Sequence, residues 1–276
     1  MAYIPMFGVI VAFKNYRYDK GILGSDWIGF KNFEFLFKSE TAFRITRNTV
    51  LYNLGYMAVT TICALAVAIL LNEISKKWLK IYQTSMILPF FLSWVVVSYI
   101  TNAFLDHQNG FLNGWLAAMG FEKVQWYFNA KYWPFILNIV HLWKAIGFSA
   151  LVYYAGILGI DAELYEAARI DGAKRWQMVT NITIPQLTPL IIILLILSIG
   201  NMFRGDFGLH FFIPNNSGMT YSTTDIIDTY IYRALSEVGD ISMASAVGLY
   251  QSFVGFVLVV TANYTVRKIN DENSLF

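Results

Sequence analysis

The 276-residue sequence is poor in charge, because Asp, Glu, Lys and Arg together make up only 14% of it. Water-soluble globular domains carry about 25% charged residues, so this composition argues against a soluble domain. The sequence has a single cysteine, Cys63, which excludes a disulfide framework within one chain. Its basic residues do not gather into clusters of more than a few, and this argues against a nucleic-acid partner.

Several motifs with a defined chemistry are also missing. No G-x-x-x-x-G-K-[ST] phosphate-binding loop occurs, so we do not expect this chain to bind ATP. There is no H-E-x-x-H, no Cys/His ligand cluster and no G-x-S-x-G, so we predict no metal site, no catalytic residue and no cofactor of its own. The long apolar runs contain no Asp or Glu, although proton-coupled carriers commonly need one there.

Apolar residues are abundant, at 57% of the sequence. A helix needs about 20 such residues, rising roughly 1.5 Å each, to cross the hydrocarbon core of roughly 30 Å. Five runs reach that length, and one of them also contains His141 and Lys144. They are residues 49–71, 83–105, 134–160, 185–203 and 242–266.

The first segment, 1–13, is apolar but too short to cross a membrane alone. It lacks the basic start and the small-residue cleavage site of a secretory signal. One interpretation is an interfacial segment; the other, which we prefer, is the second half of a first span that begins before this numbering. The predicted fold class is therefore an all-α polytopic membrane protein with about six transmembrane helices, forming a single domain over 1–276 with a truncated first span.

The polar connection 161–184 has the pattern of a short helical hairpin outside the bilayer. Asp161 is a good N-cap, and Gly172 is placed to end the first helix. A second short helix then leads to Pro185, where the membrane resumes. The first helix has an apolar side formed by Leu164, Ala167 and Ala168, with Ile170 nearby. This side needs a cover, from this chain's own spans or from a partner.

Three groups of residues in this connection form a recognisable pattern: Glu166-Ala167-Ala168, Asp171-Gly172-Ala173, and Ile182, Ile184 and Pro185. The pattern resembles the cytoplasmic loop shared by permeases of ATP-binding-cassette importers, with Ile184 in place of the usual leucine. The resemblance implies that the first helix is a coupling helix, which sits in a groove of an ATPase subunit. It assigns ATPase coupling to Glu166, Ala167, Ala168, Asp171, Gly172 and Ala173.

The resemblance extends over the whole chain. Stretches similar to the polysaccharide-type branch of the sugar permeases include Tyr3-Ile4-Pro5-Met6, Arg47-Asn48-Thr49, Leu71-Asn72-Glu73, Gly205-Asp206-Phe207-Gly208 and Ile227-Asp228-Thr229-Tyr230. This implies a multi-pass permease subunit in a bacterial cell membrane, importing a sugar, oligosaccharide or polysaccharide fragment. The implied partners are a second, non-identical permease, an ATPase dimer that holds ATP and Mg, and an extracytoplasmic solute-binding protein.

An uncharged sugar is held by aromatic faces and by neutral polar groups, and the spans offer both. The candidates for a substrate pathway are Trp94, Trp143, Phe91, Tyr250 and Asn201. Aromatic residues also fill membrane cores and interfacial belts, and amides bridge helices, so a packing role stays open for each. Lys144 lies too deep in its run to reach the interface easily, and we expect it to pair with a carbonyl or a partner's carboxylate.

Basic residues are denser in 72–82, 161–184 and the tail from Arg267 than in the longer connections between them, which modestly favours a cytoplasmic position for these segments. The connection 204–241 mixes charged residues such as Asp225 and Arg233 with aromatic ones. It is an ordered cap over the spans, or the docking surface for a solute-binding protein that the resemblance implies, or both. The rival function is a secondary, ion-coupled sugar transporter; a non-transporting scaffold would leave the pattern of 161–189 unexplained.

Overall fold

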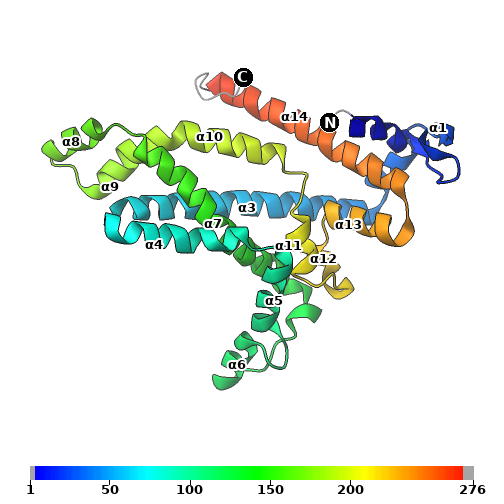
Figure 1. The fold of residues 1–276 in the computed structure, drawn as a ribbon, viewed down its shortest axis with the longest axis horizontal. Coiled ribbons are helices and arrows are strands. Elements are labelled where there is room, and N and C mark those ends of the chain that lie inside the picture. The colour runs from blue at the N-terminus through cyan, green and yellow to red at the C-terminus, as the bar shows by residue number, and fades with distance from the viewer. Residues whose placement is uncertain (1–3, 270–276) are drawn as a thin grey trace. The chain divides into compact units, whose positions relative to one another are not determined.

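The structure, a computed structural model, describes residues 4–269, and its longest helices coincide with the apolar runs (Figure 1). These helices are α3 (Glu40–Glu73), α7 (Trp133–Leu158), α10 (Ile184–Gly200) and α14 (Ile241–Ile269). Within the described residues, four helices are long and apolar enough to cross a membrane, or five if Lys76–Phe91 and Trp94–Leu105 form one broken span. The predicted all-α polytopic class is confirmed.

The run 83–105 is not one continuous helix. α4 (Lys76–Ile87) gives way to a 3-10 turn at Leu88–Phe91, and α5 (Trp94–Leu105) begins anew. Pro89 has no N–H to donate to a helical hydrogen bond, so the α-helix cannot continue unchanged through it. Ser93 then caps the new helix, because its side chain accepts a hydrogen bond from Val96 N. The run therefore breaks at Leu92 and Ser93, three to four residues after Pro89.

The connections contain short elements. The first described segment, Ile4–Phe13, is a 3-10 helix, and β1 (Lys14–Asn15) pairs antiparallel with β2 (Asp26–Trp27). Residues 1–3 and 270–276, which belong to the predicted half span and to the tail, lie outside the described residues, and the half-span interpretation stays a prediction. The short helices are α1 (Gly21–Gly24), α2 (Glu34–Lys38), α6 (Phe111–Ala118), α8 (Ala162–Ile170), α9 (Arg175–Met178), α11 (Phe207–Phe212), α12 (Tyr221–Thr224) and α13 (Ile227–Arg233).

The chain forms two compact units, each assembled from three separate stretches. Unit 1 contains Met1–Asn53, Ser93–Leu137 and Gly200–Leu258, and unit 2 contains Leu54–Leu92, Asn138–Ile199 and Val259–Phe276. α3 belongs to both, because the boundary falls inside it. That 1–276 acts as a single permease domain stays a prediction.

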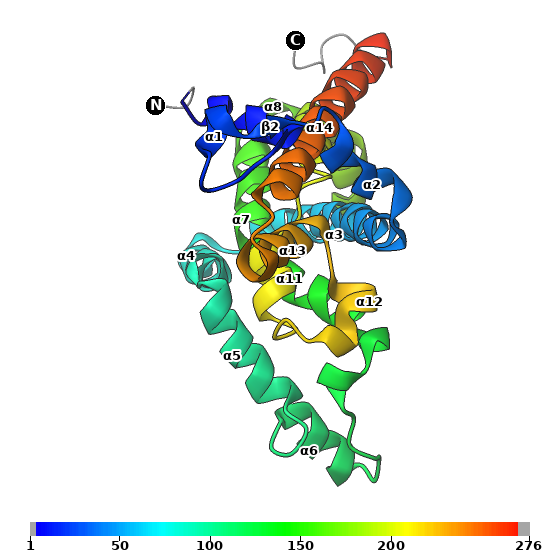
Figure 2. The ribbon, with the colours of Figure 1, turned by 90° about the vertical axis from the view of Figure 1, so that its right-hand side faces the viewer.

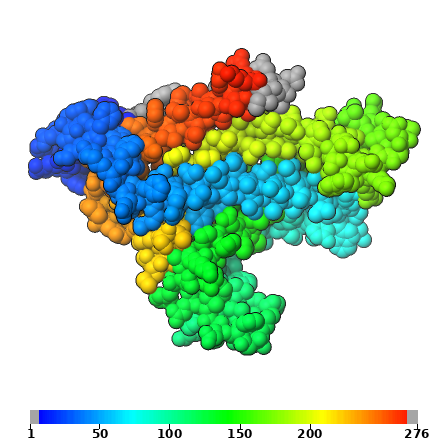
Figure 3. All heavy atoms as spheres, turned by 180° about the vertical axis from the view of Figure 1, so that it is seen from behind, coloured from blue at the N-terminus to red at the C-terminus, as the bar shows by residue number. Residues whose placement is uncertain are grey.

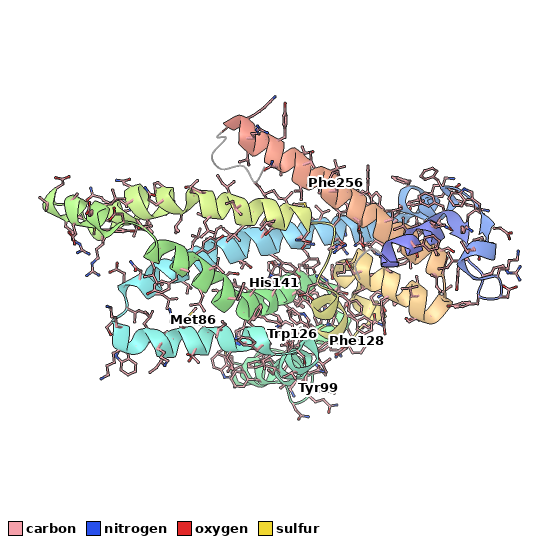
Figure 4. The ribbon with its side chains drawn as sticks, turned by 45° about the horizontal axis from the view of Figure 1, so that its top comes forward. Met86, Tyr99, Trp126, Phe128, His141 and Phe256 are labelled. Carbon is pink, nitrogen blue, oxygen red and sulfur yellow. The ribbon has the colours of Figure 1, made fainter. Side chains whose placement is uncertain are left out.

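Small residues let the helices of unit 2 approach closely. Ala64 and Ala68 of α3 and Ala150 of α7 are fully buried in a cluster that also contains Tyr153 and Leu187. Contacts of this kind drive helix association in membranes, where lipid competes equally for apolar side chains. Figure 4 labels Met86 on α4 and His141 on α7 within this unit. The cluster fixes the ends of α3, α7 and α10, between which the connection 161–184 lies.

Unit 1 holds the connection 204–241 against α14 and the first part of α3. Ile45, Ile227 and Val247 are fully buried together, and Thr49 Oγ1 accepts a hydrogen bond from Ile227 N at 3.0 Å. Figure 2 shows the chain passing through α11, α12 and α13 into α14. The connection is thus ordered against the spans, as one of its two interpretations predicts, while its docking role stays a prediction.

Candidate functional site

The coupling-loop candidates lie on α8, whose start and end are built as the sequence predicts. Asp161 caps the helix, since its Oδ1 accepts a hydrogen bond from Glu163 N at 3.0 Å. Gly172 ends it with a φ of 78°, a backbone conformation that costs glycine little. This turn lets Ala173 N donate to Ala168 O at 2.9 Å, so one of the last carbonyls of the helix is satisfied. The predicted cap and the predicted terminating glycine are both confirmed.

The second helix of the hairpin is also present. α9 follows Gly172 and continues as a π-helical turn, Val179–Thr183, into α10. Pro185 is the second residue of α10 and follows the π-helical turn directly. In Figure 1 α8 and α9 appear in yellow-green at the end where α7 stops and α10 starts. Figure 3 shows the same segment in the same colour as a projecting tip.

This hairpin exposes large apolar side chains. Leu164 is 42% exposed, Ile170 86% and Trp176 73%. Glu166 and Ala167 are exposed as well, and Glu166 also lines the cavity behind the helix. Large apolar side chains exposed outside the spans are typical of a site that another protein covers. The spans of this chain therefore do not provide the cover that the sequence analysis asks for.

Tyr165, Glu166 and Arg169 of α8 line a cavity of ≈ 280 Å³ together with residues from the ends of α3 and α7. Arg175 Nη1 lies 2.8 Å from Glu73 Oε2, which joins the end of α3 to the start of α9. The hydroxyl of Tyr165 lies 2.9 Å from Thr183 Oγ1, which joins α8 to the last residue before α10. These four side chains all line the cavity. Neither pair is predictable from the sequence alone, because the two members of each pair are far apart along the chain.

Two substrate-pathway candidates, Phe91 and Trp143, lie in unit 2. Phe91 is 72% exposed and lies edge-on to Phe90, with ring centroids 5.6 Å apart, and Trp143 is 41% exposed on α7. The next residue, Lys144, donates hydrogen bonds to Phe90 O at 2.7 Å and Pro89 O at 3.4 Å. Carbonyls at the end of a helix lack α-helical donors, and although Pro89 O also accepts from Leu92 N at 3.2 Å, these carbonyls are available to a cation. The predicted pairing of Lys144 with a carbonyl is confirmed.

The other three candidates, Trp94, Asn201 and Tyr250, lie in unit 1. A Cβ on Gly208 would overlap Trp94 Cδ1, so the indole lies directly against that glycine. Tyr250 contacts the rings of Phe37 and Phe203, each at a centroid distance of 6.1 Å. Asn201 is exposed immediately after α10. The five candidates are thus divided between the units, and their role in a substrate pathway stays a prediction.

Unit 1 contains a buried cluster of charged side chains that the sequence did not reveal. Asp225 is 2% exposed, and its Oδ1 accepts hydrogen bonds from Arg233 Nη2 at 2.6 Å and Thr229 Oγ1 at 2.7 Å. Arg44 Nη2 lies 3.9 Å from Oδ2 of the same carboxylate. A buried carboxylate persists only with such partners, so Asp225 and Arg233 hold the connection together. The four-residue spacing of Asp225, Thr229 and Arg233 is the signal that could have revealed it.

The stretch Gly205-Asp206-Phe207-Gly208 orders the start of the same connection. Gly205 N donates to Asp228 Oδ2 at 2.7 Å, and Gln251 Nε2 lies 3.3 Å from that oxygen. Burial raises the pKa of Asp228, although these two hydrogen bonds oppose the shift. Asp206 caps α11 by accepting a hydrogen bond from Leu209 N.

Within residues 4–269 no three His, Cys, Asp or Glu side chains are grouped so that they could hold a metal ion.

Sequence comparison identifies proteins similar to this chain. Residues 60–271 match the family described as "Binding-protein-dependent transport system inner membrane component", and this range includes all of 161–184. A curated relative is the "Polygalacturonan/rhamnogalacturonan transport system permease protein YteP" of Bacillus subtilis (strain 168). The two are 34% identical over 271 residues, which cover 98% of this chain and 84% of the relative.

Two solved structures are similar in both fold and sequence. One is "a bacterial ABC transporter involved in the import of the acidic polysaccharide alginate", with a TM-score of 0.88 and 34% identity over 97% of this chain and 90% of the other. The second is a bacterial alginate ABC transporter "in complex with alginate pentasaccharide-bound periplasmic protein". Its TM-score is 0.87, with 34% identity over 97% of this chain and 88% of the other.

Proposed function

Because the chain belongs to the family of binding-protein-dependent transport system inner membrane components, we propose that it is the membrane-spanning permease subunit of an ATP-driven importer. Its cargo is a sugar, oligosaccharide or polysaccharide fragment. The name of the curated relative, a polygalacturonan/rhamnogalacturonan permease, supports this cargo, and so does the alginate importer of the same fold. The protein is a multi-pass component of the bacterial plasma membrane.

The observation that best supports a separate ATPase subunit is the set of exposed apolar side chains on α8 and α9. Leu164, Ile170 and Trp176 offer an apolar surface outside the spans, which a partner gains free energy by covering. We assign this role to an ATPase subunit, which binds ATP and Mg itself. The cap at Asp161 and the turn at Gly172 set the direction of α8. The residues that we assign to the contact are Glu166, Ala167, Ala168, Asp171, Gly172 and Ala173.

The remaining partners complete an alternating-access machine. A second, non-identical permease forms the other half of the pathway, an ATPase dimer drives it, and a solute-binding protein delivers cargo to the outer face. The similar alginate importer bound to its periplasmic protein supports this assembly. In it, ATP hydrolysis is carried out by the ATPase and not by this chain.

The division of labour is tested by reconstitution. The purified chain alone is expected to hydrolyse no ATP, and proteoliposomes are expected to take up oligosaccharide only when the second permease, the ATPase dimer and the binding protein are all present. Uptake and hydrolysis are measured side by side with each component left out in turn. ATP hydrolysis by this chain alone, or uptake driven by an ion gradient without the ATPase, would refute the proposal and favour an ion-coupled carrier.

The pathway candidates make a second prediction. Trp143→Ala and Trp94→Ala are each expected to reduce uptake at limiting substrate, because losing an aromatic contact with sugar costs about 1 kcal/mol or more, by analogy with aromatic pairs. The measurement is uptake by complexes shown to contain every subunit. Trp115→Ala is the matched control, since Trp115 is 58% exposed on α6 and outside the candidate set. Normal uptake by both variants at limiting substrate would remove these residues from the pathway.

A further inference from the structure

The coupling helix α8 has a second side, which faces inward. Leu164 and Ile170 are exposed, whereas the neighbouring Tyr165 is only partly exposed and lines the ≈ 280 Å³ cavity. The Tyr165 hydroxyl lies 2.9 Å from Thr183 Oγ1, eighteen residues further along the chain. The hydrogen bond therefore crosses the hairpin and joins α8 directly to the residue that precedes the span α10.

The covalent route between the same two helices is longer and softer. It passes through the glycine turn at Gly172, where an added Cβ would meet nothing within 4 Å, and then through α9. The hydrogen bond from Ala173 N to Ala168 O sets the resting direction of this turn, but its glycine backbone can rotate under load and absorb part of a displacement of α8. The side-chain route contains only the few rotatable bonds of Tyr165 and Thr183, and Thr183 is 5% exposed, so it is shorter and stiffer than the covalent route.

Thr183 ends an unusual segment. Val179–Thr183 is a π-helical turn, a conformation that accounts for well under 1% of residues and is frequent at functional sites. Thr183 Oγ1 also lies 3.5 Å from Met178 O, at the limit of a hydrogen bond, so the Tyr165 hydroxyl is the closer partner. The cavity beside the pair leaves room for the two side chains to move together.

We propose that Tyr165 and Thr183 are positioning residues that transmit the displacement of the coupling helix to the span α10, with the π-helical turn as the joint. This inference rests on the proposed function, in which an ATPase moves α8. When the ATPase closes, α8 moves with it, and the hydrogen bond pulls the start of α10 in the same step. Without the bond, the Gly172 turn absorbs part of the movement and hydrolysis is no longer fully converted into transport.

The experiment measures sugar imported per ATP hydrolysed by the complete importer in proteoliposomes, with its binding protein and an oligosaccharide that the wild type takes up. Tyr165→Phe keeps the ring and removes the hydroxyl, and Thr183→Val removes the partner with little change in shape. Each is expected to lower the ratio about fivefold, the factor that corresponds to one net hydrogen bond, while hydrolysis continues. The double variant is expected to be no worse than either single variant, because both remove the same bond.

Two variants serve as controls. Thr183→Ser keeps the hydroxyl and is expected to retain the wild-type ratio. Thr180→Val removes a hydroxyl of the same π-helical turn that bonds to Trp176 O instead, and it too is expected to retain the ratio. These controls separate loss of this particular bond from a general disturbance of the turn.

The outcomes distinguish failure of the Tyr165–Thr183 proposal from failure of the proposed transport function. If Tyr165→Phe and Thr183→Val leave the ratio unchanged, or lower hydrolysis and uptake in equal proportion, the bond is merely structural and the inference is overturned. An additive loss in the double variant overturns it as well. In those cases ATP-dependent uptake by the wild type leaves the proposed function standing, whereas wild-type uptake that needs no ATPase would end both.

Discussion

Replacing Gly147 with alanine is expected to prevent α4 and α7 from packing as they do in the wild type. An added Cβ would overlap the carbonyl oxygen and carbon of Met86 and would lie 2.9 Å from Ile87 N. All three are backbone atoms, so no side chain can rotate away and the two helices must separate. Overpacking of this kind costs about 3 kcal/mol, at the upper end of the usual range.

The measurement is thermal unfolding of the purified chain or complex in detergent. A loss of this size should lower the melting temperature by roughly 5–10 °C. Gly248→Ala is the matched control, because Gly248 lies in the spanning helix α14 and an added Cβ there would meet nothing within 4 Å. Its substitution should be neutral or slightly stabilising, since alanine is the better helix former. A wild-type melting temperature for Gly147→Ala would contradict the close approach of α4 and α7.

Features that depend on residues close together in the sequence were predictable from the sequence. The cap at Asp161 and the positive φ at Gly172 follow from residues within a few positions of each other, and both are present. The spans follow from run length, because the bilayer requires about 20 apolar residues whatever their partners are. For these features the sequence is close to sufficient.

Features that depend on distant partners were not predictable from one sequence. The run 83–105 reads as one span because it carries no charge, although Pro89 and the cap at Ser93 mark the place where the helix breaks. The Tyr165–Thr183 pair depends on a π-helical turn, for which no composition rule exists. The contact between Arg44 and Asp225 joins positions far apart along the chain. Pairing of this kind is set by tertiary packing, which a single sequence does not encode in any local pattern.

The candidate site divides in the same way. The coupling residues form one short helix and its exit turn, so their sequence order already fixes their arrangement in space. The pathway candidates come from several helices, and the structure places Phe91 and Trp143 in one unit but Trp94, Asn201 and Tyr250 in the other. Residue type alone cannot distinguish an aromatic that contacts sugar from one that packs, as Tyr250 does against Phe37 and Phe203.

Two substitutions in the coupling loop are expected to abolish import while the spans stay inserted. Valine at Gly172 must adopt a φ of 78° or redirect the chain, and a β-branched residue resists that conformation, at a cost on the order of 1–3 kcal/mol. α9 and the start of α10 would then leave their positions behind α8. Gly172→Asn is the matched control, because asparagine tolerates the left-handed region and should retain most of the uptake.

Glu166→Lys acts on the same interface by charge. Glu166 is exposed on α8, and if it faces a basic residue in the ATPase groove, reversal places like charges together in a partly desolvated interface, at a cost on the order of several kcal/mol. Glu166→Gln, which removes the charge without reversing it, should lose less. The readouts are substrate-stimulated hydrolysis, uptake, and co-purification of the ATPase, and we expect either loss of the ATPase or hydrolysis without import. If Glu166→Lys and Gly172→Val both keep full uptake and normal ATPase retention, 161–184 is not the coupling element. An interface that depends on the charge of Glu166 and on the direction of the Gly172 turn could not survive both changes.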